Sequence, residues 1–270
     1  MPRATVRDIA LHYERGGCPS GPPVLLISGT GGDLRQEPNM LASPLAATFD
    51  LLAYDQRGLG RSDKPDMAYT MADYGRDAAG LLDAVAWGSC AVVGISFGGM
   101  VAQELALLVP QRVTRLVLCC TSSGGPGGSS YPLHELEGLS EEERLARSLS
   151  LMDSRWDARW QAANPEIVDL MRARRAMSAG DAEAGTGARR QLDARAAHDS
   201  YARLRQLTMP TLVCAGRFDA IAPPANAEAL AAQIPRATLQ VFDGGHAFLL
   251  QDPSAWPAIV AFLAGGQPST

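Results

Sequence analysis

One serine of this sequence is placed where a nucleophile would be held. The stretch VVGISFGGMVAQE, which begins at Val92, changes within a few residues from a strand pattern to a helix pattern. The turn between them reads Gly94-x-Ser96-x-Gly98, a spacing that exposes a serine hydroxyl on a strained strand-to-helix turn. Because glycine and serine also fill ordinary turns, the motif predicts a nucleophile only if the chain supplies a base and an acid.

The base must come from four histidines. His12 lies in a predicted entry hairpin and is expected at the surface, whereas His134 and His198 lie in a helical region where packing or substrate-lining roles are expected. His246 follows the last predicted strand on a Gly-Gly loop that enters a helix. This puts His246 at the same end of the sheet as Ser96, so we assign it as the base; the alternative is a loop histidine with a structural hydrogen bond.

An acid must hold the tautomer of that histidine. Asp219 follows the predicted strand Thr211–Ala215 and precedes His246, which gives the chain order serine, acid, histidine. The strand Arg115–Cys120 is followed by TSSGG, which offers no carboxylate. Asp243 is expected to cap or brace the loop of His246 instead. We therefore assign Asp219 as the acid.

Two backbone N–H groups are needed to stabilise the negative charge of the reacting oxygen. Phe97 follows the nucleophile at the start of its helix, where unpaired N–H groups favour an anion. The second donor is expected from SGTGGD, after an earlier strand, with Thr30 favoured and Gly29 or Gly31 as alternatives. The same stretch matches neither spacing of a phosphate-binding glycine loop, so nucleotide binding is not expected.

Short apolar runs alternate with helical patterns, which predicts an α/β fold whose mostly parallel sheet has helices on both faces. The expected strands are Thr5–Ile9, Leu11–Arg15, Val24–Ser28, Leu51–Tyr54, Ala91–Ile95, Arg115–Cys120, Thr211–Ala215 and Leu239–Phe242. The first two are expected to form an antiparallel hairpin. The expected helices are Met71–Val85 with Thr70 as N-cap, Met100–Leu108, Ala225–Gln233 and Trp256–Leu263.

The alternation stops between residues 126 and 206, where the patterns are helical. Residues 1–125 and 207–270 are therefore expected to form the core, and 126–206 a helical cap over the edge of the sheet where strands end. The stretch opens with GGPGGSS, which is typical of a linker. A glycine- and alanine-rich interruption is expected at 178–188, followed by a helix over 191–204.

Several side chains are expected to contact the substrate. Gly29, Met100 and Phe248 lie close in sequence to the predicted catalytic groups, and with Phe97 they predict an apolar pocket for an uncharged or hydrophobic ligand. Trp156 and Trp160 are four residues apart and are expected to share one helix face. They line the acyl pocket or, as we favour, anchor the cap on the core.

Composition narrows the class of protein. The chain has 270 residues, a formal charge of −5 and a pI near 5.4, which excludes a basic surface for nucleic acid. It has no apolar stretch long enough for a signal peptide or a membrane span. Its five cysteines lack metal or redox spacing and are expected to be reduced, mostly buried thiols. We expect a cytoplasmic protein with no metal and no cofactor; its oligomeric state stays open.

Together, SGTGG, DQRGLGRSD, GISFGG, GRFDAIAPP and GGHAFLLQDP resemble the α/β-hydrolase superfamily. The resemblance implies an eight-stranded sheet with a cap after the sixth strand. Within the superfamily the chain is most similar to small bacterial hydrolases typified by 3-oxoadipate enol-lactonase and aclacinomycin methylesterase, which cleave lactones and methyl esters without a cofactor. It departs from many relatives in having Ser28-Gly29 where they have His-Gly. The serine nucleophile argues against dehalogenase and epoxide hydrolase chemistry.

The sequence thus predicts hydrolysis of an ester or lactone through an acyl-enzyme on Ser96. Two alternatives stay open. One is a cofactor-free perhydrolase or haloperoxidase, which uses the same three residues. The other is a binding protein that keeps the fold without turnover, because fold does not dictate function.

Overall fold

The computed structural model describes residues 2–178 and 182–265; for residues 174–178 and 182–184 it describes the backbone only. Eight strands form one sheet in the order β1-β2-β4-β3-β5-β6-β7-β8. β1 pairs with β2 and β2 with β4 in antiparallel fashion, and all later pairs are parallel. The strands are β1 (Arg3–Val6), β2 (Ile9–Gly17), β3 (Pro23–Ile27), β4 (Asp50–Tyr54), β5 (Cys90–Ile95), β6 (Val113–Cys119), β7 (Thr211–Gly216) and β8 (Ala237–Phe242). The predicted fold class and the entry hairpin are confirmed.

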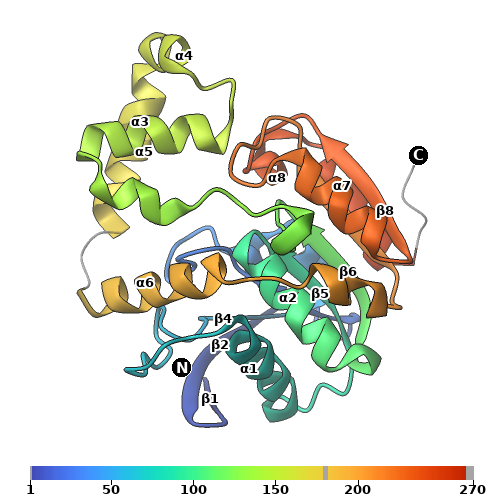
Figure 1. The fold of residues 1–270 in the computed structure, drawn as a ribbon. Coiled ribbons are helices and arrows are strands. Elements are labelled where there is room, and N and C mark those ends of the chain that lie inside the picture. Colours follow the sequence, from blue (N-terminus) through green and yellow to red (C-terminus); the bar gives the residue numbers. More distant parts are fainter. Residues whose placement is uncertain (1, 179–181, 266–270) are drawn as a thin grey trace.

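Helices cover the sheet on both faces (Figure 1). Alternate residues of a strand point to opposite faces, and in β3 Leu25 and Ile27 enter one core while Val24 and Leu26 enter the other. The first core is closed by α1 (Met71–Ala84), α2 (Phe97–Leu108) and α7 (Pro224–Gln233). The second is closed by α8 (Phe248–Gln251), α9 (Ala255–Leu263) and two 3-10 turns, Met40–Ala42 and Pro44–Ala47.

Helix α1 begins as its sequence predicts. The Thr70 N–H donates to the Asp73 carboxylate at 3.1 Å, and the Asp73 N–H donates to the Thr70 hydroxyl at 3.1 Å. This reciprocal pair satisfies two N–H groups that the helix itself leaves free. Further along α1, Asp77 forms a buried two-point ion pair with Arg57 of the DQRGLGRSD loop, at 2.5 and 2.7 Å. The loop is thereby tied to the helix beside the sheet.

The segment between β6 and β7 is helical, as expected. It contains α3 (Glu141–Met152), α4 (Ala158–Ala163), α5 (Pro165–Ser178) and α6 (Ala182–Ala196). Figure 1 shows α3, α4 and α5 gathered at one end of the molecule, with α6 leading back toward the sheet. We call residues 126–206 the helical insertion.

Two expectations for the helical insertion are wrong in detail. Gly185 and Gly187 lie inside α6 and do not interrupt it, while Gly180 lies outside the described residues. Gly187 is held there by close packing, because a Cβ on it would lie 1.8 Å from the carbonyl oxygen of Gly58. The helix expected over 191–204 ends at Ala196, and the chain then pairs with the 124 region and forms a 3-10 turn over Tyr201–Gln206.

His12 is also corrected by the structure. Its side chain is buried, not at the surface. β2 has strands on both sides, and the loop after β4 covers this part of it. The His12 Nε2 lies 2.7 Å from a guanidinium nitrogen of Arg61 and 3.1 Å from a carboxylate oxygen of Glu14. In the part of the chain that the structure describes, no helix combines the length and the apolar composition needed to cross a membrane.

Candidate active site

Ser96 occupies a strained turn between β5 and α2. Its φ of 54° and ψ of −116° place a non-glycine residue in a region that L side chains rarely adopt. The turn is fixed from both sides. The Ser96 N–H donates to the Cys119 carbonyl at 2.8 Å, and the Thr121 hydroxyl donates to the Ser96 carbonyl at 2.7 Å. Hydrogen bonds to the end of β6 therefore hold the serine at the carboxyl edge of the sheet.

The two glycines of the motif are required by close packing. A Cβ on Gly98 would lie 2.1 Å from the carbonyl oxygen of Ile27, and one on Gly94 would lie 2.4 Å from the carbonyl oxygen of Gly98. No side chain fits at either distance. The first turn of α2 thus lies directly on the end of β3, beside the loop that begins at Ser28.

The structure brings together the three residues predicted for the nucleophile, base and acid. The Ser96 Oγ lies 3.0 Å from His246 Nε2, and His246 Nδ1 lies 2.7 Å from Asp219 Oδ2. Each residue follows a different strand, β5, β8 or β7, and parallel strands end at one edge. We call these three residues the relay: at these distances the imidazole can accept the serine proton, while the carboxylate orients the imidazole and stabilises its charge.

Asp219 is buried, and hydrogen bonds hold both of its carboxylate oxygens in place. Its second oxygen accepts the N–H groups of Ile221 and Ala222, each at 2.8 Å. The carboxylate is thereby fixed in the orientation that faces His246. The nearby Cys120 offers a sulfur within 4.8 Å of the ligand atoms of Asp219 and His246. Burial, followed by the charge of Asp219, raises the pKa of the Cys120 thiol well above its usual value, so the thiol stays neutral beside the relay.

The structure narrows the choice of oxyanion donors. The Gly31 N–H donates to the side-chain oxygen of Gln191 at 2.8 Å and is thus already used. Gly29 lies against Ser96, since a Cβ on it would be 3.5 Å from the serine Cβ. Phe97 is the first residue of α2, so its N–H has no acceptor within the helix. The N–H groups of Phe97 and Thr30 therefore remain as the expected pair, with Gly29 as the alternative to Thr30.

Contacts from the helical insertion reach the loop of His246, and no motif or spacing in the sequence predicts them. The His246 N–H donates to the carbonyl of Met152 at 2.6 Å, and the Ala220 N–H donates to the carbonyl of Leu151 at 3.1 Å. The buried Asp153 accepts a hydrogen bond from Gln251, whose side-chain oxygen accepts the Gly245 N–H at 2.8 Å. The end of α3 thus holds the loops of both base and acid.

Three side chains expected to line an apolar pocket do not do so. Phe97 and Phe248 expose 0% of their surface and Met100 exposes 2%, so other protein atoms enclose all three side chains. Phe97 packs edge-on against Tyr74 in the core under α1 and α2, which Met100 joins. Phe248 stacks on Phe242 in the core of the opposite face. Phe97 keeps its expected role only through its backbone.

The tryptophan pair is arranged differently from the expectation. Asp157 caps α4, so Trp160 lies in the helix and Trp156 precedes it. The two rings stack at 5.0 Å with an angle of 15° between their planes. The two side chains are therefore neighbours because their rings stack, and not because they share one helix face.

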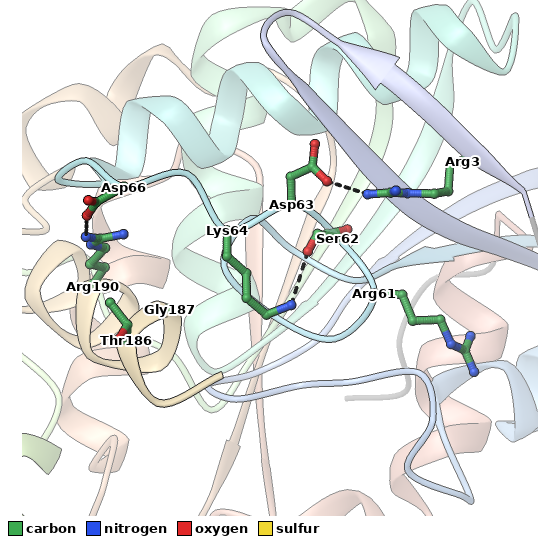
Figure 2. A pocket seen from close by; sticks show the side chains of 9 residues that line it. All are labelled: Arg3, Arg61, Ser62, Asp63, Lys64, Asp66, Thr186, Gly187 and Arg190. Atoms are coloured by element: carbon green, nitrogen blue, oxygen red, sulfur yellow. Dashed lines mark hydrogen bonds and ion pairs between the residues drawn. The ribbon is translucent and has the colours of Figure 1, made fainter. Parts of the chain in front are cut away.

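A pocket of about 600 Å³ lies apart from the relay (Figure 2). Its lining residues are Arg3, Arg61, Ser62, Asp63, Lys64, Asp66, Thr186, Gly187 and Arg190. Two of its arginines already have carboxylate partners: Arg3 pairs with Asp63 at 2.5 Å, and Arg190 pairs with Asp66. None of the three relay residues lines this pocket, so we do not assign it to the chemistry.

Comparison with known proteins identifies the family of this chain. Residues 22–253 match the family described as alpha/beta hydrolase fold. The chain is 35% identical to "Putative carbamate hydrolase RutD" of Variovorax paradoxus over 94% of this chain and 96% of that one. It is 26% identical to 3-oxoadipate enol-lactonase 2 of Acinetobacter baylyi over 93% and 92% of the two chains.

Among solved structures, the enol-lactonase from Burkholderia xenovorans superposes with a TM-score of 0.78 at 25% identity. The match covers 98% of this chain and 100% of that chain. Because the family match spans most of the sequence and includes the segments that carry Ser96 and His246, the chain belongs to the alpha/beta hydrolase fold family.

Proposed function

We propose that the protein is a serine hydrolase that cleaves a carboxylic ester or a lactone through an acyl-enzyme on Ser96. The observation that carries the proposal is the continuous relay from Ser96 Oγ through His246 to Asp219, at 3.0 and 2.7 Å. The curated relative named 3-oxoadipate enol-lactonase 2 supports a lactone or ester carbonyl as the target. The relay and the expected donors require no cofactor.

The residues divide the reaction between them. His246 Nε2 takes the proton of Ser96 as the serine oxygen bonds to the carbonyl carbon, and the carbonyl electron pair moves onto oxygen. The N–H groups of Phe97 and Thr30 stabilise that oxyanion, while Asp219 stabilises the imidazolium. Collapse breaks the carbon–oxygen bond to the alcohol, which leaves with the proton from His246.

Water completes the cycle. His246 removes a proton from a water molecule, whose oxygen attacks the acyl carbon, and the acid departs as Ser96 regains its proton. In this proposal the helical insertion acts as the cap that closes the site, because the end of α3 contacts the loops of His246 and Asp219. Trp156 and Trp160 belong to this cap, and Gly29 forms the wall beside Ser96.

The test is steady-state hydrolysis of p-nitrophenyl esters of increasing acyl length by the unmodified protein and by Ser96→Ala. We expect turnover by the unmodified protein and a loss of more than about 10⁴-fold in kcat for the variant. Equal turnover by both proteins would exclude Ser96 as the nucleophile. No turnover of any ester or lactone by the unmodified protein would favour a binding protein with this fold. Peroxide-dependent activity in a carboxylate buffer would favour the perhydrolase alternative.

A further inference from the structure

One face of α6 carries two buried polar side chains one helical turn apart. Gln191 exposes 0% of its surface and Arg195 exposes 7%. Residues four apart on a helix lie on one face, one above the other. Burial of a guanidinium is costly unless it is paired and hydrogen-bonded. The buried guanidinium of Arg195 therefore needs hydrogen-bond acceptors.

Arg195 has an unfilled hydrogen-bonding edge. Its Nη1 donates to the carbonyl oxygen of Tyr131 at 2.7 Å. Its Nε and Nη2 are enclosed and have no acceptor among the described residues. None of the described carboxylates forms an ion pair with Arg195, and burial lowers its pKa to about 10. The Nε2 amide nitrogen of Gln191 likewise has no acceptor within the described chain.

This face of α6 spans the two sides of the active site. At one end, the Gln191 side-chain oxygen accepts the N–H of Gly31, next to the expected oxyanion donor Thr30. At the other, Arg195 contacts Tyr131, whose N–H donates to the carbonyl of Ile221 at 2.7 Å. Ile221 follows Asp219 by two residues and donates to its carboxylate. Gln191 and Arg195 thus connect the oxyanion loop with the acid loop.

The protein itself shows what the unfilled edge of Arg195 is suited to bind. Arg57 uses the same two atoms, Nε and Nη2, to hold both oxygens of Asp77 at 2.5 and 2.7 Å. This side-on arrangement matches the planar fork of a carboxylate. By contrast, Arg3 and Arg190, which line the pocket of Figure 2, already have carboxylate partners.

We propose that Arg195, assisted by Gln191, binds a carboxylate carried by the substrate, so that the ester or lactone cleaved at Ser96 is an anion. The inference rests on the proposed function and adds the substrate class to it. Every unsatisfied atom on this face is an N–H donor, which calls for an acceptor-rich, negatively charged ligand. An anionic substrate replaces the expectation of an uncharged or hydrophobic one, since Phe97, Met100 and Phe248 are packed in the cores.

The test compares matched charged and neutral substrates. One pair is the p-nitrophenyl monoester of glutarate against p-nitrophenyl valerate; the other is 4-acetoxybenzoate against phenyl acetate, with the carboxylate on the alcohol side. The unmodified protein should prefer the charged member of at least one pair. Arg195→Met should lower kcat/KM for that charged ester by about tenfold to a hundredfold, mainly by raising KM. It should change kcat/KM for the neutral ester of the same pair less than about threefold.

Arg189→Met is the matched control, because Arg189 lies on the same helix but half-exposed, paired with Glu137. It should leave the preference unchanged. A preference for the neutral member of both pairs, or an equal effect of Arg195→Met on charged and neutral esters, would overturn the proposal. If Arg195→Met does not fold, Arg195→Lys replaces it, since lysine keeps the charge but loses the two-point edge.

A binding measurement separates this proposal from the proposed function. Glutarate should raise the Tm of the unmodified protein, whereas its neutral diamide should not, and Arg195→Met should abolish the shift. If neither ester pair is hydrolysed but this shift appears, the hydrolase proposal fails and the carboxylate site stands. If the esters are hydrolysed without charge preference and glutarate gives no shift, the hydrolase proposal stands and the carboxylate site fails.

Discussion

The backbone N–H of His246 donates a 2.6 Å hydrogen bond to the carbonyl oxygen of Met152. Met152 is the last residue of α3, so the base of the relay is held by the helical insertion as well as by the core. Next to it, Asp153 is fully buried and binds both Arg155 and Gln251. The position of the base is therefore coupled to how the helical insertion is seated.

Asp153 is expected to act as a positioning residue. In Asp153→Asn the negative charge that holds Arg155 at 2.7 Å is lost. Gln251, whose side-chain oxygen accepts the Gly245 N–H, also loses the carboxylate that fixes its side chain. We expect kcat to fall about tenfold, equivalent to about 1.4 kcal/mol, with KM changed little. Steady-state kinetics on one ester measures both constants.

The matched control is Asp243→Asn, because Asp243 also pairs with Arg155 but is exposed, and exposed ion pairs contribute little. If both variants lowered kcat equally, or if Asp153→Asn changed only the Tm, Asp153 would have a structural role alone.

Gln191 is expected to hold the oxyanion loop. In Gln191→Met the acceptor of the Gly31 N–H is removed while the volume is kept. The loop that carries Thr30 then gains freedom, and we expect kcat to fall about fivefold, less than for loss of a donor itself. The comparison uses a neutral ester, so that carboxylate binding does not contribute. An unchanged kcat with a raised KM would show that the loop needs no such support.

The packing of the nucleophile turn predicts that Gly98 tolerates no side chain. In Gly98→Ala the new Cβ would lie 2.1 Å from the Ile27 carbonyl oxygen, and backbone must move to admit it. We expect the free energy of unfolding to fall by about 3 kcal/mol and activity to be lost. Gly88→Ala is the control, because no atom lies within 4 Å of a Cβ built there. Urea titration of both variants measures the difference; equal stability would contradict the packing described.

His198 predicts a loss of stability in acid. Burial lowers its pKa to about 4, against the opposing charge of Glu104, and neither ring nitrogen has a hydrogen-bond partner among the described residues. Between about pH 6.5 and that value the unfolded chain binds a proton that the folded chain excludes. The free energy of unfolding should therefore fall as pH falls through this window.

The variant His198→Leu removes this effect, because it has no proton to bind. Its advantage over the unmodified protein should grow by about 3 kcal/mol between neutral pH and pH 4. Other groups near His198, such as Arg203 and Asp199, are present in both proteins and cancel in the difference. Parallel stability curves for the two proteins would contradict the prediction.

The relay could be predicted from sequence because each of its residues belongs to a local motif. Ser96, Asp219 and His246 each follow a strand of a parallel sheet, and parallel strands end at one edge. That single topological rule places Ser96 and His246 together although 150 residues separate them. The glycines around Ser96 follow from the same local geometry.

The contacts made by the helical insertion could not be predicted in this way. The bonds of Met152 to His246 and of Gln191 to Gly31 depend on how α3 and α6 dock on the core, which no periodicity encodes. Nearness in sequence also misled the pocket prediction. Phe248 follows His246 by two residues, yet α8 turns its ring into the core against Phe242.

The most direct test of the central claim is to trap the covalent intermediate on Ser96. A p-nitrophenyl phosphonate ester should release one p-nitrophenolate per protein chain and inactivate the protein. Peptide mapping by mass spectrometry should then find the phosphonyl group on the peptide that contains Ser96, and Ser96→Ala should release none. Labelling of another residue, or full ester hydrolysis by a protein that the reagent leaves unlabelled, would contradict an acyl-enzyme on Ser96.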